Sequence, residues 1–172
     1  TYTKKLILAA LMAALTAVAT MVIQVPTPTG GYIHLGDGFV LLSGILLGPI
    51  LGGLSAGIGS MLADLLTGYI QWAPATFVIK ALAAILGGFV YKILAKKLSL
   101  NSYLSIILSG IASGTIVVLG YLSYNTLLLG NGFAAAVASV PTDTLQSVFG
   151  IIVATFLIPL IYKLPSIKDM LK

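Results

Sequence analysis

The sequence contains no cysteine and few charged residues, and these absences exclude several classes of protein. Without cysteine the chain has no disulfides, no thiolate chemistry and no cysteine metal site. Charged residues make up 8% of the 172 residues, against about a quarter in an ordinary soluble domain. A soluble fold of this size could not hide a composition that is 59% hydrophobic from water. A soluble enzyme, a disordered tail and a nucleic-acid-binding domain are therefore excluded.

Several transport and nucleotide motifs are also missing. The sequence has no Walker A glycine loop, so we expect no nucleotide hydrolysis by this chain. It has no inverted repeat typical of secondary transporters and no filter-like repeat or acidic ring typical of channels. All nine cationic residues are lysines, and they flank apolar segments instead of forming a basic patch. Together with a mean hydropathy of +1.12, this pattern predicts a polytopic membrane protein.

The apolar segments predict an all-α membrane protein, a single domain over residues 1–172 with six transmembrane helices. Glycine, proline and polar clusters separate the segments, and the second is short enough to extend through Gly36 and Asp37 or to be re-entrant. Lys4-Lys5 and the following apolar run also fit a signal peptide, but the run continues to Val25, so we interpret it as the first helix. The predicted spans are 6–25, 39–47, 50–66, 74–94, 103–124 and 144–162.

The lysines predict the orientation, with both termini in the cytoplasm. Six spans place eight of the nine lysines on one side of the membrane, as the positive-inside rule requires. The ninth, Lys80, falls within the fourth span. The eight are Lys4, Lys5, Lys92, Lys96, Lys97, Lys163, Lys168 and Lys172.

The three connections on the opposite side carry most of the other polar residues. They are predicted at 26–38, 67–73 and 125–143, and the first is expected to be an ordered, non-helical segment because it contains two prolines and two adjacent glycines. The last is expected to be a long, weakly polar loop. We predict an outward-facing pocket roofed by these three segments.

Ionisable residues within spans are candidates for function because burying them in a membrane is costly. Lys80 lies about 9 Å into the fourth span at about 1.5 Å per residue, and Asp64 lies near the outer end of the third. The two are therefore expected at similar depth. Lys80 can form a structural pair with Asp64, extend outward to water, or donate to a polar ligand.

The remaining candidates are polar or aromatic residues near the outer ends of the spans. His34 fits either a loop hydrogen bond or a ligand contact, and a metal role is not expected without a second histidine or a cysteine. Asp37 and Asp143 are each expected to cap a helix start, the second and the sixth. Trp72 fits either an interfacial belt or ligand stacking. Further hydrogen bonds to a ligand are predicted from Tyr121, Asn125, Gln146 and, as an alternative to capping, Asp143.

Small residues at three- or four-residue spacing predict close helix packing along three stripes. The first is formed by Ala9, Ala13 and Ala17, with Ala10 and Ala14 beside them. The others are Gly53, Gly57 and Ser60, and Gly110 and Gly114. Each stripe fits either packing inside the bundle or a partner surface.

These features in this order resemble the substrate-binding S component of energy-coupling factor (ECF) vitamin transporters, over essentially the whole chain. The resemblance is carried by the alanine spacing of the first helix and by four stretches of sequence. These are His34-Leu-Gly-Asp37-Gly-Phe-Val-Leu-Leu, Leu47-Gly-Pro49 with Gly52-Gly53, Ser60-Met-Leu-Ala-Asp64-Leu-Leu-Thr-Gly68, and Trp72-Ala-Pro74 leading to Phe77-Val-Ile-Lys80. The combination is most similar to the riboflavin, pyridoxine or hydroxymethylpyrimidine branch.

The resemblance implies a multi-pass protein of a prokaryotic plasma membrane that captures a water-soluble vitamin or precursor from outside. Pyridoxine or hydroxymethylpyrimidine is favoured, with riboflavin next. It implies a transmembrane coupling (T) subunit and two cytoplasmic ATPase subunits as partners, docked on the first-helix alanines. It also implies a pocket that includes Trp72, Lys80, Tyr121, Asn125 and Gln146. The chain itself is expected to bind no cofactor, metal or nucleic acid and to be no enzyme.

Two alternatives come from other classes of protein. An intramembrane aspartyl protease would use Asp37 and Asp64, but position 34 is histidine where the Gly-x-Gly-Asp signature needs glycine. A stand-alone secondary transporter or a regulatory membrane subunit would work without ATPase partners. Uptake that depends on such partners discriminates against this second alternative.

Overall fold

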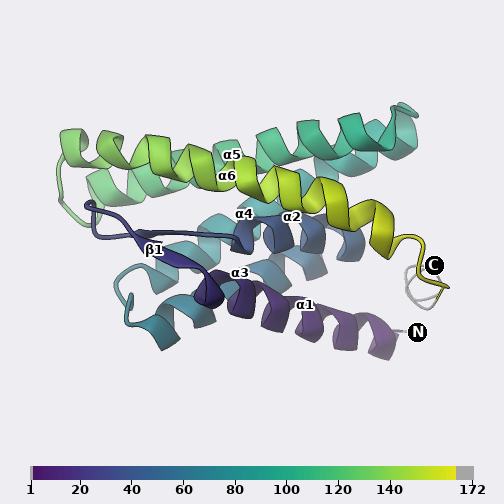
Figure 1. Cartoon of the computed structure of the whole chain (residues 1–172), viewed down its shortest axis with the longest axis horizontal. Coiled ribbons are helices and arrows are strands. Elements are labelled where there is room, and N and C mark those ends of the chain that lie inside the picture. Colours follow the sequence, from purple (N-terminus) through teal and green to yellow (C-terminus); the bar gives the residue numbers. More distant parts are fainter. Residues whose placement is uncertain (1, 166–172) are drawn as a thin grey trace.

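The computed structural model describes residues 2–165, and within them the chain forms six α-helices and one short hairpin (Figure 1). Five helices are long and apolar enough to cross a membrane. Their bounds are α1 Tyr2–Val22, α3 Pro49–Thr67, α4 Ala73–Tyr91, α5 Ser102–Leu127 and α6 Phe133–Ile161. A π-helical turn, η1 (Lys92–Lys97), continues α4. The predicted all-α membrane architecture is confirmed.

The remaining helix, α2 (Gly36–Leu47), is central and short. Its 12 residues extend about 18 Å, less than the hydrocarbon thickness of about 30 Å. Ten of the 12 are buried, because α2 packs against α1, α3, α4 and α6. The predicted extension of this span through Gly36 and Asp37 is confirmed.

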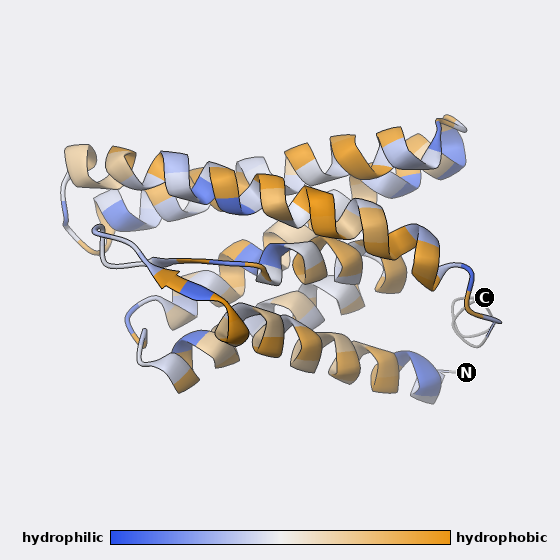
Figure 2. Cartoon of the chain, in the orientation of Figure 1, coloured by the Kyte–Doolittle hydropathy of each residue, from blue (hydrophilic) through white to orange (hydrophobic). Residues whose placement is uncertain are grey.

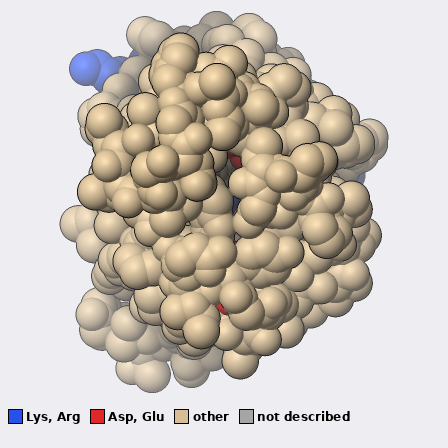
Figure 3. Space-filling view, turned by 90° about the vertical axis from the view of Figure 1, so that its left-hand side faces the viewer, with Lys and Arg blue, Asp and Glu red and all other residues tan. Residues whose placement is uncertain are grey.

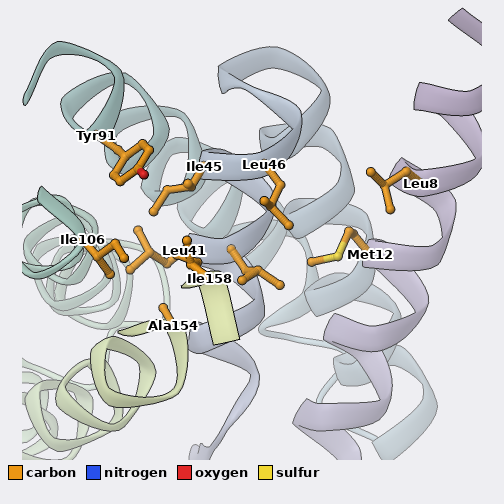
Figure 4. Close-up of a cluster of buried hydrophobic side chains, with 10 residues drawn as sticks. Leu8, Met12, Leu41, Ile45, Leu46, Tyr91, Ile106, Ala154 and Ile158 are labelled. Atoms are coloured by element: carbon orange, nitrogen blue, oxygen red, sulfur yellow. The ribbon is translucent and has the colours of Figure 1, made fainter. Parts of the chain in front are cut away.

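The core gathers around α2, as the cluster in Figure 4 shows. At the crossing of α2 and α4 the backbones nearly touch, since a Cβ on Gly44 would overlap the carbonyl of Ala84 and one on Gly88 would overlap that of Gly44. This close approach fixes α4 against α2. The buried cluster contains Leu8, Met12, Leu41, Leu42, Ile45, Leu46, Tyr91, Ile106, Ala154 and Ile158.

Large apolar side chains cover the outward faces of the long helices, as expected for a surface in contact with lipid (Figure 2). Ile58, Val78 and Phe156 are 40%, 52% and 70% exposed. Hydrophilic residues concentrate at the two ends of the bundle (Figure 2).

One end of the bundle carries the start of α1, the end of α6 and the η1 turn (Figure 1). Each of these lies next to or contains lysines. Lys5, Lys92 and Lys96 line a groove of about 670 Å³ there, together with the start of α3. This grouping agrees with the predicted clustering of lysines on one side. Lys168 and Lys172 lie outside the described residues. We call this the lysine end.

The opposite end carries the hairpin and the α3–α4 and α5–α6 connections (Figure 1). Strand β1 (Gln24–Pro26) pairs antiparallel with β2 (Tyr32–His34), with Val25 opposite Ile33. The predicted ordered, non-helical segment is therefore this hairpin. We call this end the cavity end.

The predicted long loop over 125–143 is wrong, because α5 continues to Leu127 and α6 already begins at Phe133. Ala134, Ala135 and Ala136 favour helix, and Pro141 is accommodated inside α6. The hydroxyls of Ser139 and Thr142 donate to nearby backbone carbonyls, as is common where proline interrupts a membrane helix. Asp143 consequently lies within α6 and does not cap its start.

The three small-residue stripes all pack inside the bundle. Gly53 and Gly57 face α4, and Gly110 and Gly114 face α6. On α1, Ser55 of α3 donates a hydrogen bond of 2.6 Å to the carbonyl of Ala9, and a Cβ on Gly59 would overlap the carbonyl of Ala13. Ala9 and Ala13 are half-buried and Ala17 is buried, whereas Ala10 and Ala14 are exposed.

Candidate functional site: a cavity under the hairpin

A cavity with about 510 Å³ of empty space opens at the cavity end. Figure 3 looks onto this end and shows acidic atoms recessed between uncharged ones. The hairpin and helices α3, α4, α5 and α6 each contribute to its wall. The lining residues are Thr27, Thr29, Gly31, Tyr32, His34, Asp64, Trp72, Thr76, Tyr121, Ser139, Thr142, Asp143 and Gln146.

Three side-chain contacts hold the hairpin on α3 and on the α3–α4 connection. The Tyr32 hydroxyl donates to Asp64 Oδ1, and Gln24 Nε2 donates to the Thr67 hydroxyl at 3.2 Å. Trp72 Nε1 donates to the carbonyl of Gly30, also at 3.2 Å. The hairpin is thereby fixed as the roof of the cavity.

Tyr32 is held as a neutral hydrogen-bond donor. Burial and the neighbouring Asp64 carboxylate raise the pKa of its hydroxyl well above the usual range. Its ring lies 4.6 Å from that of Tyr69 between centroids. The aromatic wall next to Asp64 is therefore rigid and uncharged.

Trp72 forms a second aromatic wall with Tyr121. The two rings are 5.9 Å apart between centroids and nearly perpendicular, an edge-to-face packing. The Tyr121 hydroxyl shares a hydrogen bond of 3.0 Å with Thr76. Trp72 therefore lies at the cavity, which fits the ligand-stacking hypothesis better than the interfacial belt.

Behind the cavity wall, Lys80 pairs with Asp37, so the predicted pairing of Lys80 with Asp64 is wrong. Lys80 is fully buried, and its Nζ lies 5.3 Å from the centroid of the Tyr121 ring. Gln146 Nε2 donates to the other Asp37 oxygen at 2.9 Å. Asp37 sits in the first turn of α2 but makes no capping hydrogen bond, because Lys80 and Gln146 occupy its carboxylate.

Gln146 connects this buried pair to His34. Its Oε1 accepts from the backbone N–H of His34 at 3.2 Å, and His34 Nδ1 accepts from the N–H of Gly36 at 2.9 Å. Burial first, and then the Lys80 charge, lowers the pKa of His34 to about 3, although Asp37 acts in the opposite direction. His34 is therefore neutral near pH 7. Since Nδ1 accepts, Nε2 carries the proton and is the nitrogen free to donate.

Five of the seven predicted substrate-binding residues line the cavity: His34, Trp72, Tyr121, Asp143 and Gln146. Lys80 is behind the wall. Asn125 is turned to the α5–α6 connection, where its side-chain oxygen accepts from Asn131 at 2.7 Å. A ligand contact by either residue stays a prediction, and the geometry gives both a structural role.

Sequence reasoning missed several lining residues, among them Tyr32 and Thr76. A usable signal existed in α6, where four polar residues follow the i, i+3, i+4, i+7 spacing of a single helix face. The assignment of 127–140 to a loop concealed this pattern. The four residues are Ser139, Thr142, Asp143 and Gln146.

The geometry does not favour the aspartyl protease alternative. Asp37 is neutralised by Lys80, and Asp64 accepts from Tyr32, so the two carboxylates do not share a proton as a catalytic dyad does. Within residues 2–165 no three histidine, cysteine or acidic side chains gather as a metal site would require.

Comparisons with known proteins give this chain a family, a relative and a fold. Residues 1–163 match the sequence profile of the ECF-type riboflavin transporter, S component. A protein of Pyrococcus woesei, described as an uncharacterized protein in the gap 3′ region, is 38% identical over 137 residues, covering 79% of this chain and 86% of its own. The solved structure of the S component of a bacterial ECF transporter superposes with a TM-score of 0.69 at 18% identity, over 95% of this chain and 98% of that one.

The superposition supports the fold, and the profile match identifies the family. The family consists of multi-pass membrane subunits that bind substrate for a transporter and are not themselves enzymes. The chain belongs to the ECF-type riboflavin transporter S component family.

Proposed function

We propose that the chain captures a small water-soluble vitamin or vitamin precursor in the cavity under the hairpin. Pyridoxine-type and hydroxymethylpyrimidine-type compounds are favoured, and riboflavin is next. The cavity itself carries the proposal, because it combines aromatic walls from Trp72 and Tyr121 with hydroxyl, amide and imidazole groups that can orient a polar ring.

The proposal places the cavity end outside the cell and the lysine end in the cytoplasm. Basic residues beside membrane spans favour the cytoplasmic side, which supports this orientation. A T subunit and two ATPase subunits would then drive release of the ligand inward. Family membership supports these partners.

The α1 surface is the proposed contact with the T subunit. Because the backbones of Ala9 and Ala13 contact α3 and Ala17 is buried, the contact would centre on the exposed Ala10 and Ala14. Small side chains there allow a partner helix to approach closely.

Fluorescence of Trp72 tests ligand capture, because it is the only tryptophan in the chain. The purified protein would be titrated in detergent with riboflavin, pyridoxine and hydroxymethylpyrimidine, and binding would be checked by calorimetry. A saturable change with one compound supports the proposal. No response in either measurement to any of them would contradict it.

Uptake by cells tests the partners. Accumulation of the bound compound should require co-expression of the T and ATPase subunits. Accumulation by the chain alone would instead support the stand-alone transporter.

A further inference from the structure

Two carboxylates at the cavity have an oxygen with no hydrogen-bond partner. Asp64 is 2% exposed, and its Oδ1 accepts from Tyr32 while its Oδ2 is buried and unpartnered. Asp143 Oδ2 is likewise buried and unpartnered, on the α6 wall. Both residues line the same cavity. A buried carboxylate oxygen without a donor is costly, so each one is a position where a bound molecule can supply a donor.

No lysine among the described residues lines the cavity, and the Lys80 charge acts on these two carboxylates only from behind its wall. Lys80 is the one buried lysine among residues 2–165, and its partner is Asp37. His34 is neutral near pH 7, as its low pKa indicates. Three of the four acidic residues of the chain thus gather at this end around a single lysine.

The cavity also offers aromatic surfaces that suit a flat, positively charged molecule. Trp72 and Tyr121 form one wall and Tyr32 another. Ring faces attract cations, and the tyrosine hydroxyls are already occupied by Thr76 and Asp64. The donors required by Asp64 and Asp143 therefore come most simply from the ligand.

We infer that the cavity selects an aromatic heterocycle carrying a positively charged amino group, which Asp64 and Asp143 recognise through their unpartnered oxygens. This inference rests on the proposed function and names the class of its substrate. The cavity is therefore expected to bind the aminomethyl form of a one-ring compound more tightly than its hydroxymethyl form.

Matched pairs of probes test the inference. One pair is 4-amino-5-aminomethyl-2-methylpyrimidine against its 5-hydroxymethyl counterpart, and the other is pyridoxamine against pyridoxine, with riboflavin as the large neutral probe. Calorimetry on the purified full chain at neutral pH should show at least one amine binding about tenfold or more tighter than its alcohol.

Variants then locate the preference. Asp64→Asn keeps an oxygen for Tyr32, and Asp143→Asn keeps the shape of the α6 wall. Each should weaken the amine about tenfold and change the alcohol by less than about threefold. Thr142→Val, on the same face of α6, is the matched control and should affect both members of a pair equally.

Three outcomes overturn the inference. They are equal or tighter binding of the alcohols, binding of riboflavin alone, and an amine preference that survives in both asparagine variants. In each of these the proposed function still stands, because a ligand is bound. Failure of every probe would contradict the inference and the proposed function together.

Discussion

The two ends of the bundle differ in the sign of their charges and in how deeply those charges are buried. At the cavity end three carboxylates are wholly or partly buried, and each has a defined position in a wall or hydrogen-bond network. At the lysine end Lys92 and Lys96 are exposed around an open groove, and among the described residues that line it there is no carboxylate. Buried charge at one end specifies contacts, whereas exposed charge at the other specifies orientation in the membrane.

The largest expected effect comes from breaking the buried pair behind the cavity. Lys80→Met leaves Asp37 buried without its cation, and this should lower the free energy of unfolding by about 3–5 kcal/mol. Thermal unfolding in detergent measures the loss. Lys96→Met at the lysine end is the matched control and should change stability by less than about 0.5 kcal/mol.

The double variant Lys80→Met/Asp37→Leu separates pairing from ligand contact. Replacing both charges by apolar residues should recover most of the lost stability, because a buried pair is often no better than an apolar one. A stable Lys80→Met protein that had lost only ligand binding would show instead that Lys80 contacts the ligand.

A smaller and more selective effect, on uptake alone, is expected from a substitution on the exposed face of α1, between the two ends of the bundle. Ala14→Trp places a large side chain on the exposed face of α1 and should reduce partner-dependent uptake about tenfold or more while leaving ligand affinity unchanged. Uptake and calorimetry on the same variant measure the two quantities. Ala13→Trp, at a half-buried position whose backbone carbonyl contacts α3, should destabilise the bundle. Normal uptake by Ala14→Trp would remove α1 as the docking surface.

Lowering the pH tests the environment of His34. The pKa of His34 is about 3 in the folded protein, whereas the ordinary value for histidine is 6.5. Between these two pH values the unfolded chain binds more protons at His34 than the folded chain does. The stability that comes from keeping His34 neutral is therefore complete above pH 6.5 and is lost as the pH falls toward 3. The slope is at most about 1.4 kcal/mol per pH unit. The difference between the parent protein and His34→Gln, measured from pH 7 to pH 5 by chemical unfolding, isolates it. Equal slopes would contradict the low pKa.

The smallest effect is expected at the lysine end. Replacing Lys5, Lys92 and Lys96 together by glutamine should change ligand affinity by less than about twofold, because these side chains line a groove at the far end from the cavity. Calorimetry with the best probe measures this. Loss of affinity comparable to that of Asp143→Asn would mean that the two ends are coupled.

Most of the fold could be predicted from the sequence, because membrane spans are encoded by long apolar runs that lysines and prolines interrupt. The start of α6 could not, since Pro141, three residues before the predicted span 144–162, looks like a loop boundary. Inside a membrane helix the missing N–H of Pro141 is tolerated while hydroxyls bond to nearby carbonyls. The rule that a proline ends a helix failed here, because the contacts of α6 within the bundle keep it helical through Pro141.

The site was harder to predict than the fold because partners are chosen in three dimensions. Asp64 and Lys80 were expected at similar depth, yet depth does not say which carboxylate faces the amine. Asp37 competes successfully because α2 lies at the centre of the bundle against α4, whereas the hairpin brings Tyr32 to Asp64. Side-chain direction around a helix axis is not encoded by hydropathy.

The brevity of α2 has a consequence for how the chain enters the bilayer. A helix of 12 residues that carries Asp37 is too short to partition as an independent span, and α4 carries the matching Lys80. Each charge becomes acceptable in the membrane only when the other is beside it. We therefore expect α2, α3 and α4 to leave the insertion machinery as one unit, with α2 joining the bilayer only after α4 has been synthesised.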